Sequence, residues 1–137
     1  MKGILISIKQ EYCQQILAGT KRVEYRKSVP TKNGEKFTMI IYESRSNVKK
    51  IVGKATVEKV DSNTPQKIWD QTHAVGEIEK EKFLEYFKTK EIAYAYRLTE
   101  VVRFRNPVSL KEIGKTAPQN WTFLTEEEIN KVIKLGE

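Results

Sequence analysis

Cysteine and histidine are nearly absent from this chain of 137 residues, which contains one of each, Cys13 and His73. A single cysteine excludes an intramolecular disulfide, and one cysteine with one histidine cannot build a Cys/His metal site. No apolar run approaches the ~20 residues of a membrane-spanning helix, and the N-terminus lacks the apolar core of a signal peptide. A glycine-rich phosphate loop and a dinucleotide-binding fingerprint are also missing. We therefore expect a cytoplasmic protein without metal, membrane contact or cofactor.

Basic charge is concentrated in one half of the chain. The net charge is +7, and residues 1–60 hold 13 of the 25 lysines and arginines but only 5 of the 18 acidic residues. A basic half indicates an anionic partner, most commonly nucleic acid, because neutralised phosphates release counterions. An anionic membrane surface is the main rival. It favours a basic amphipathic helix, whereas these cations fall mainly in predicted strands and loops.

The length fits one domain, and no repeat or linker divides residues 1–137. Alternating apolar residues and turn signals, among them Asn33-Gly34, predict about six short strands, at residues 4–8, 21–27, 37–43, 51–60, 92–98 and 101–105. Short helices interrupt these strands, so the pattern predicts an α+β fold with a small curled sheet or barrel. Parallel βαβ units would need longer helices between the strands.

Four helices are expected from apolar spacing and capping residues. One covers residues 10–18 and ends at Gly19, and a second begins at Thr64-Pro65. A third covers residues 79–88 and is expected to pack Leu84 inward with its phenylalanines. The fourth follows Thr125, because a glutamate three residues later completes a capping box.

The densest polar cluster runs from Gly19 to Lys27, where glycine ends the first helix and Lys21 enters the next strand. On a strand, Glu24 and Arg26 point to the same face, roughly 6–7 Å apart, so they can form an ion pair. A lysine, a glutamate and an arginine at the rim of a sheet could hold a phosphate or a base edge. A solvated charged face on an edge strand is the alternative interpretation.

The spacing of Gly19, Lys21, Glu24 and Arg26 resembles the Gly-x-Lys-x-x-Glu-x-Arg signature of ASCH domains. These are PUA-like β-barrels related to the YTH and EVE modules, which recognise RNA or modified bases. Residues 117–121 are similar to a Pro-Gln-aromatic stretch in bacterial and archaeal relatives described as predicted transcriptional regulators. The resemblance implies that residues 1–137 form a single PUA-like mixed β-barrel.

The resemblance also implies a cleft between the first helix, the motif strand and neighbouring loops. The residues expected to bind a ligand or nucleic acid there are Ser7, Lys9, Lys21, Arg22, Glu24, Tyr25, Arg26, Lys27, Tyr42 and Ser44. Tyr25 and Tyr42 are candidate stacking platforms, although strand tyrosines more often belong to the core. Trp121 either lines the cleft or fastens the C-terminal segment to the barrel, and we favour the second.

Three functions remain open, and the leading hypothesis is a module that binds RNA or a nucleotide, with or without a regulatory role. DNA as the partner and the oligomeric state stay undecided. The alternative is a small hydrolase, since some ASCH-like proteins are reported as ribonucleases or as an amidohydrolase acting on acetylated cytidine. The amidohydrolase type has threonine where Glu24 stands, and a catalytic Lys21 must be partly neutral. Because a nearby carboxylate favours the protonated lysine, we expect binding; a protein-interaction domain with an acidic partner is the third possibility.

Overall fold

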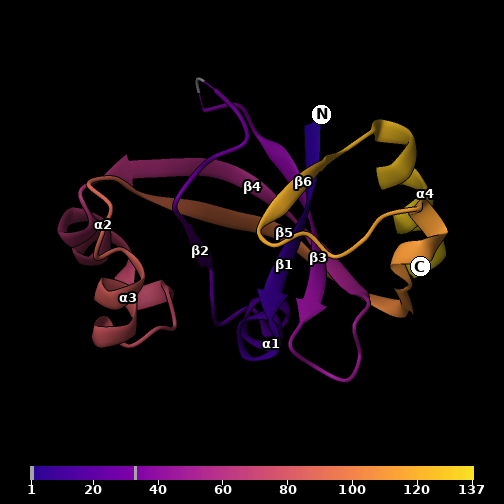
Figure 1. The fold of residues 1–137 in the computed structure, drawn as a ribbon, viewed down its shortest axis with the longest axis horizontal. Coiled ribbons are helices and arrows are strands. Elements are labelled where there is room, and N and C mark those ends of the chain that lie inside the picture. The colour runs from indigo at the N-terminus through magenta and orange to yellow at the C-terminus, as the bar shows by residue number, and fades with distance from the viewer. Residues whose placement is uncertain (1, 33) are drawn as a thin grey trace.

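A six-stranded mixed sheet organises the chain, seen in a computed structural model that describes residues 2–32 and 34–137. Its strands lie in the order β2-β5-β4-β3-β1-β6, and only β1 and β3 are parallel. The curled sheet forms a half-barrel, with β2 and β6 at its edges (Figure 1). The strand bounds are β1 Lys2–Lys9, β2 Val23–Arg26, β3 Phe37–Ser44, β4 Ile51–Asn63, β5 Ala93–Val108 and β6 Trp121–Leu124.

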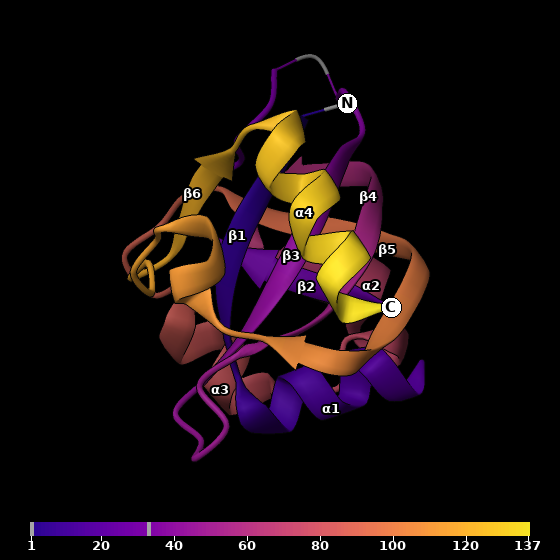
Figure 2. The same cartoon turned by 90° about the vertical axis from the view of Figure 1, so that its right-hand side faces the viewer.

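Four α-helices surround the sheet, so the predicted α+β class is confirmed. Their bounds are α1 Gln10–Ala18, α2 Pro65–Thr72, α3 Lys80–Tyr86 and α4 Glu126–Gly136, and short 3-10 turns cover His73–Val75 and Leu110–Ile113. Helices α2 and α3 lie at one end of the molecule and α4 at the other, with α1 below the sheet (Figures 1 and 2). No helix of the described residues is long and apolar enough to cross a membrane.

Both faces of the central strands are buried, which explains why the sheet has helices on either side. In β1, Ile4, Ile6 and Ile8 join a cluster with α1, while Leu5 points the opposite way into a cluster with Ile129 of α4. A third cluster packs β2 and the start of β5 against α2 and α3. Burial of apolar area on this scale stabilises the fold by ~25 cal/mol per Å². Because both faces of the central strands are covered, a binding site can form only at the strand ends, where polar residues lie.

Several sequence expectations are confirmed and others are wrong in detail. The capping box is present, since the Thr125 hydroxyl accepts from the Glu128 amide and the Glu128 carboxylate accepts from the Thr125 amide. The two strands expected at 92–98 and 101–105 are one strand, β5, which continues through Glu100 in a left-handed conformation with a φ of 49°. Leu84 is 40% exposed rather than packed inward. The turn expected at Asn33-Gly34 involves Asn33, which lies outside the described residues.

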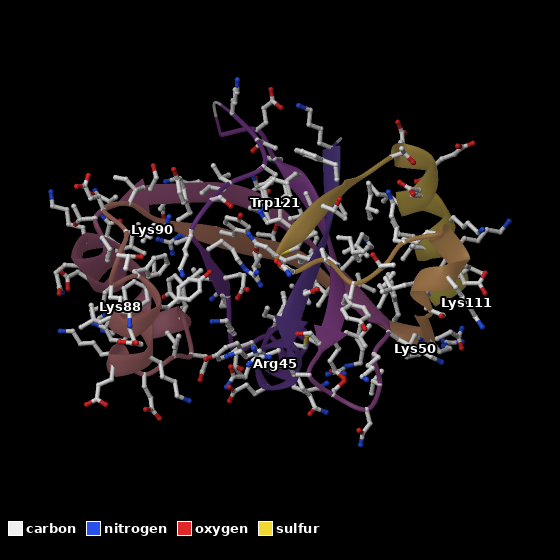
Figure 3. All side chains as sticks on the ribbon, in the orientation of Figure 1. Arg45, Lys50, Lys88, Lys90, Lys111 and Trp121 are labelled. Carbon is white, nitrogen blue, oxygen red and sulfur yellow. The ribbon has the colours of Figure 1, made fainter. Side chains whose placement is uncertain are left out.

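Trp121 fastens β6 to the rest of the sheet. It pairs with Ile6 in the antiparallel ladder between β6 and β1. Its indole N–H donates to the Ser28 hydroxyl at 3.3 Å, and its ring is half-buried against the first core cluster (Figure 3). The segment before it, residues 117–120, is thereby held across the ends of β1 and β2, where the candidate site lies.

Candidate nucleic-acid site

The end of α1 delivers Lys21 to the mouth of β2. Gly19 adopts a left-handed conformation with φ of 87°, which glycine accepts without steric cost. The amides of Thr20 and Lys21 then donate to the Gln15 carbonyl at 3.0 and 3.1 Å, so the chain leaves the helix in a tight turn. The Lys21 side chain is directed inward and is only 2% exposed. A buried lysine is uncommon and needs partners for its charge.

Those partners are a carbonyl and two aromatic rings. The Lys21 ammonium donates to the backbone carbonyl of Gly76 and lies 5.0 and 5.1 Å from the ring centroids of Tyr12 and Tyr25. Burial is the largest influence on this group and lowers the pKa of Lys21 from its ordinary value, although Glu24 opposes the shift. Glu24 thus acts in the direction that the sequence argument gave it, but burial is the larger influence on the pKa of Lys21.

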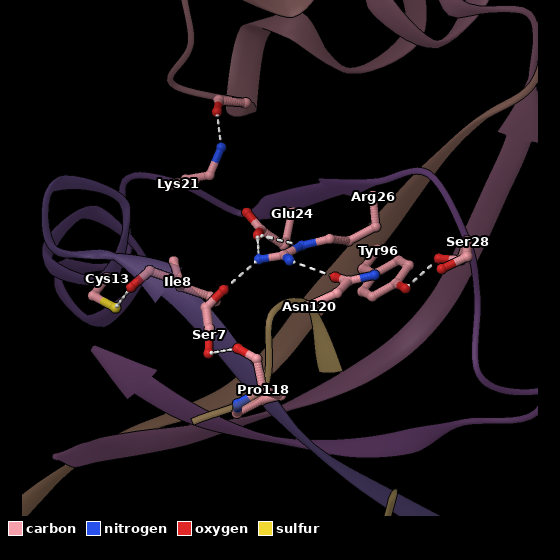
Figure 4. Close-up of polar contacts among 11 residues, drawn as sticks. Ser7, Ile8, Cys13, Lys21, Glu24, Arg26, Ser28, Tyr96, Pro118 and Asn120 are labelled. Carbon is pink, nitrogen blue, oxygen red and sulfur yellow. Dashed lines mark hydrogen bonds and ion pairs between the residues drawn. The ribbon is translucent and has the colours of Figure 1, made fainter. Parts of the chain in front are cut away.

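Glu24 and Arg26 form a buried ion pair that ties three segments together. The Glu24 Oε2 atom accepts from Nε and Nη2 of Arg26 at 3.0 and 2.7 Å. The same guanidinium donates through Nη2 to the Ser7 carbonyl at 2.9 Å and through Nη1 to the Asn120 side chain at 2.7 Å (Figure 4). Burial opposes the charge of Arg26, but the charge and hydrogen bond of Glu24 outweigh it and raise the pKa of Arg26. Arg26 thus joins β2, β1 and the segment before β6.

The other carboxylate oxygen of Glu24 has a different environment. Among the described residues, no side chain or amide donates to Oε1, and Glu24 is one of the residues that line a cleft. This oxygen is an open acceptor within a site whose ammonium donor is Lys21. The motif residues therefore have different roles. Arg26 bonds β2 to its neighbouring segments, while Lys21 and one oxygen of Glu24 face the space beside these strands.

That space is a cleft of about 650 Å³. Apolar and aromatic side chains and cations share its surface, a mixture that is typical of sites for planar, charged ligands. Its lining residues are Ser7, Ile8, Lys9, Tyr12, Lys21, Glu24, Tyr25, Arg26, Ser44, Arg45, Ile78, Lys82, Glu85, Tyr86, Ala117, Pro118 and Gln119. They come from β1, α1, β2, the β3 end, α3 and the segment before β6.

Seven of the ten residues expected at the site line this cleft: Ser7, Lys9, Lys21, Glu24, Tyr25, Arg26 and Ser44. Ser7 also fastens the cleft wall, since its hydroxyl donates to the Pro118 carbonyl at 2.6 Å. The Tyr25 ring is not an open platform, because it packs edge-on against Phe83 and its hydroxyl bonds to the Thr72 hydroxyl. Tyr25 therefore belongs mainly to the core under the cleft.

The other three expected residues do not line the cleft. Tyr42 is 7% exposed and packs in the cluster beneath α4, on the opposite face of the sheet. The expectation was wrong because strand alternation cannot say which face of a sheet buried on both sides carries a ligand. Arg22 is exposed, and its amide donates to the Val75 carbonyl. Lys27 is also exposed, with its ammonium 4.5 Å from the ring centroid of Tyr86.

Residues that the sequence analysis missed come chiefly from α3 and the turn before it. Ile78, Lys82 and Tyr86 form one wall of the cleft, and Arg45 lies at its rim. These positions are distant from the motif in sequence, and apolar spacing marked only Leu84 and the phenylalanines of α3 as inward residues. A neighbouring hollow of about 440 Å³ contains His73. The described residues hold no cluster of three or more histidine, cysteine, aspartate or glutamate side chains suited to a metal ion.

Comparison with known proteins identifies the family. The family model described as "ASCH domain" matches residues 6–107, which include the motif strand and most of the sheet. The chain belongs to the ASCH domain family. This confirms the resemblance that the four motif residues suggested.

Similar ASCH proteins match nearly the whole chain. An ASCH domain-containing ribonuclease of Zymomonas mobilis is 29% identical over 138 residues, which are 98% of this chain and 92% of that protein. The crystal structure of ASCH from Zymomonas mobilis is 26% identical, covers 99% of this chain and 96% of that one, and has a TM-score of 0.88. A tyrosine-to-phenylalanine mutant of the same protein gives a TM-score of 0.89 at 25% identity, with both chains covered fully. A protein named ATP synthase subunit alpha from Ureaplasma parvum is 29% identical over 123 residues, but the chain spans only 15% of its length.

Proposed function

We propose that this ASCH domain binds single-stranded RNA and holds one nucleotide of the strand in the cleft. The observation that carries the proposal is the convergence of Lys21 and the open oxygen of Glu24 on one hollow bounded by Tyr12 and Tyr86. A charged donor beside an acceptor can engage a base edge or a phosphate, and aromatic walls suit the face of an unstacked base. The basic N-terminal half and the ribonuclease name of the Zymomonas relative support RNA as the partner.

Fluorescence anisotropy with a labelled single-stranded RNA tests this proposal. We expect the single strand to bind more tightly than the same sequence in a duplex, because a stacked and paired base cannot enter the cleft. Tyr86→Leu should weaken binding by ~1–3 kcal/mol if a base stacks on this ring. The matched control is Tyr94→Leu, which changes a half-buried tyrosine outside the lining. Equal affinity for duplex and single strand, or equal losses in the two variants, would contradict the proposal.

Cleavage of the bound strand is a second candidate function, favoured by the lowered pKa of the Lys21 ammonium beside Glu24. In ribonucleolytic transesterification the 2′-oxygen attacks the adjacent phosphorus and gives its proton to a base, while the 5′-oxygen leaves with a proton from an acid. Glu24 Oε1 would serve as the base. Lys21 would serve as the acid, because a lowered pKa makes an ammonium a better donor near neutral pH.

Binding and cleavage are distinguished by measuring whether the RNA itself is cut, in addition to whether a complex forms. Wild-type protein is incubated with an end-labelled RNA and with the same strand carrying 2′-deoxy nucleotides throughout, and the products are resolved on a denaturing gel. Cleavage of the RNA alone, lost in Glu24→Gln, would support the second candidate. An intact RNA under conditions where anisotropy shows saturation would leave binding as the function.

A further inference from the structure

A second group of cations lies beside the cleft and outside the motif. The connection between β3 and β4 carries Arg45, Lys49 and Lys50, and the second half of β5 carries Arg103 and Arg105. All five side chains are exposed. Within the described residues none of them has a carboxylate at ion-pair distance, whereas six other cations do: Arg26, Lys36, Lys59, Lys88, Arg97 and Lys115. We call these five residues the cationic strip.

A buried carboxylate fixes the first part of the strip. Glu43 is 1% exposed, and its two oxygens accept from the Gln14 amide at 2.8 Å and from the Ser46 hydroxyl at 2.9 Å. Its backbone amide donates to the Lys50 carbonyl at 3.0 Å, which closes the β3–β4 connection. Burying a carboxylate is costly unless it is hydrogen-bonded, so this loop is held in one shape. The shape presents Arg45 and Lys50 outward.

The same network reaches β5. The side-chain oxygen of Gln14 accepts from Nη1 of Arg103 at 3.3 Å, so α1 links Arg103 to the β3–β4 connection. Phe104 is buried against α4, and its two neighbours Arg103 and Arg105 therefore both point away from that core. Figure 2 shows the β3–β4 connection, α1 and the last part of β5 together along the lower edge of the molecule.

The strip is continuous with the cleft, because Arg45 belongs to both. Arg45 has a φ of 53° and Lys49 a φ of 47°, left-handed values that turn the connection sharply at each point. In Figure 3, Arg45 lies near the lower centre and Lys50 to its right, while Lys88 and Lys90 lie at the opposite end of the molecule. The strip thus extends from the cleft away from the end of the molecule that holds Lys88 and Lys90.

We propose that the cationic strip binds the phosphates of the RNA strand as it leaves the cleft. The inference rests on the proposed function and adds to it a path for the strand outside the cleft. Exposed cations without acidic partners give contacts that are independent of base sequence and strongly dependent on salt. An acidic protein surface would also be attracted, but the shared residue Arg45 favours the ligand that occupies the cleft itself.

The test compares two double variants with matched charge changes. Arg103→Gln with Arg105→Gln removes two cations of the strip, and Lys67→Gln with Lys90→Gln removes two exposed cations from the end that holds α2 and α3. Each protein is titrated by anisotropy with single-stranded RNAs of about two and about ten nucleotides, at several salt concentrations. The longer strand is within the ~4–16 nucleotides that single-strand binders cover.

For the strip variant we expect a loss of about three- to tenfold for the longer RNA and less than about twofold for the dinucleotide. The slope of log affinity against log salt should fall by about 1.4 for the longer RNA, since each lost phosphate contact removes ~0.7. The control variant should match wild type. Equal losses of RNA affinity in the two double variants, or an unchanged salt slope in the strip variant, would contradict the proposed role of the strip even if wild-type protein binds RNA. Absence of RNA binding by wild-type protein would instead refute the proposed function.

Discussion

Replacing Lys21 by methionine separates the two roles of the buried ammonium. Methionine has a similar length and keeps the apolar stem, but it cannot donate to a ligand or carry charge. A hydrogen bond from a charged group contributes ~1.5–3 kcal/mol, so RNA affinity should fall on the order of 10- to 100-fold. The matched control is Lys27→Met, which removes an exposed cation outside the cleft. We expect the control to lose no more than about threefold, as exposed charges are screened by solvent.

The same substitution has a different effect on stability. The Gly76 carbonyl loses its donor, at a cost of ~1–3 kcal/mol, but the chain no longer buries an ammonium. These effects oppose each other, so we expect the free energy of unfolding at neutral pH to change by less than ~2 kcal/mol. A large loss of binding with a small change in stability would mark a residue buried for its ligand rather than for the fold.

Stability against pH gives a second readout. Burial lowers the pKa of Lys21 in the folded chain below its ordinary value of 10.5, so between these values the unfolded chain binds more protons. The free energy of unfolding of wild-type protein should therefore increase as pH rises through that window and level off above it. Lys21→Met should lack this increase, and Lys27→Met should keep it. Parallel urea-unfolding profiles for wild type and Lys21→Met, or equal RNA affinities for the two variants, would refute the reasoning.

Three further substitutions test the contacts that shape the cleft and the fold. Asn120→Ala removes the acceptor of Arg26 Nη1 and should lower the free energy of unfolding in urea by ~1–3 kcal/mol, whereas an unchanged midpoint would show that water replaces the amide. Gly76→Ala places a Cβ against the Tyr25 hydroxyl and should cost ~1–3 kcal/mol in the same assay; a neutral result would mean that the turn yields freely. Thr125→Ala removes the α4 capping box and should cost ~1 kcal/mol by thermal unfolding without changing RNA affinity, and a loss of affinity would contradict the placement of the site.

Local patterns in the sequence were sufficient for most of the fold. The alternation in β1, the glycine after α1 and the capping box before α4 each depend on residues within one or two turns of one another. The break predicted between residues 98 and 101 was wrong because Glu100 takes a left-handed conformation inside a strand that remains paired with β4. That pairing is a tertiary effect, and the polar Thr99-Glu100 pair alone resembles a turn. Leu84 was misplaced because α3 buries only one narrow face against β2.

The ion pair of the motif could be predicted because its two residues are close in sequence. The different roles of the motif residues could not be predicted. Sequence spacing placed Glu24 and Arg26 on one face of a strand, and they do form an ion pair. It could not show that the Arg26 guanidinium also donates to the Ser7 carbonyl and to the Asn120 side chain, which are 19 and 94 residues away along the chain. The lowered pKa of Lys21 likewise depends on burial, which local sequence does not report.

Arg26 holds the cleft together, because its guanidinium bonds β2 to β1 and to the segment before β6. Without Arg26, the carboxylate of Glu24 would be a buried charge with no cation bonded to it, and the segment before β6 would lose its side-chain tie to β2. An arginine suits this task because its rigid planar fork reaches three separate groups and stays charged when buried, whereas a buried lysine loses its charge more readily. Holding Glu24 by one oxygen also leaves the other available. The arrangement that stabilises the cleft is therefore the one that leaves an acceptor open beside Lys21.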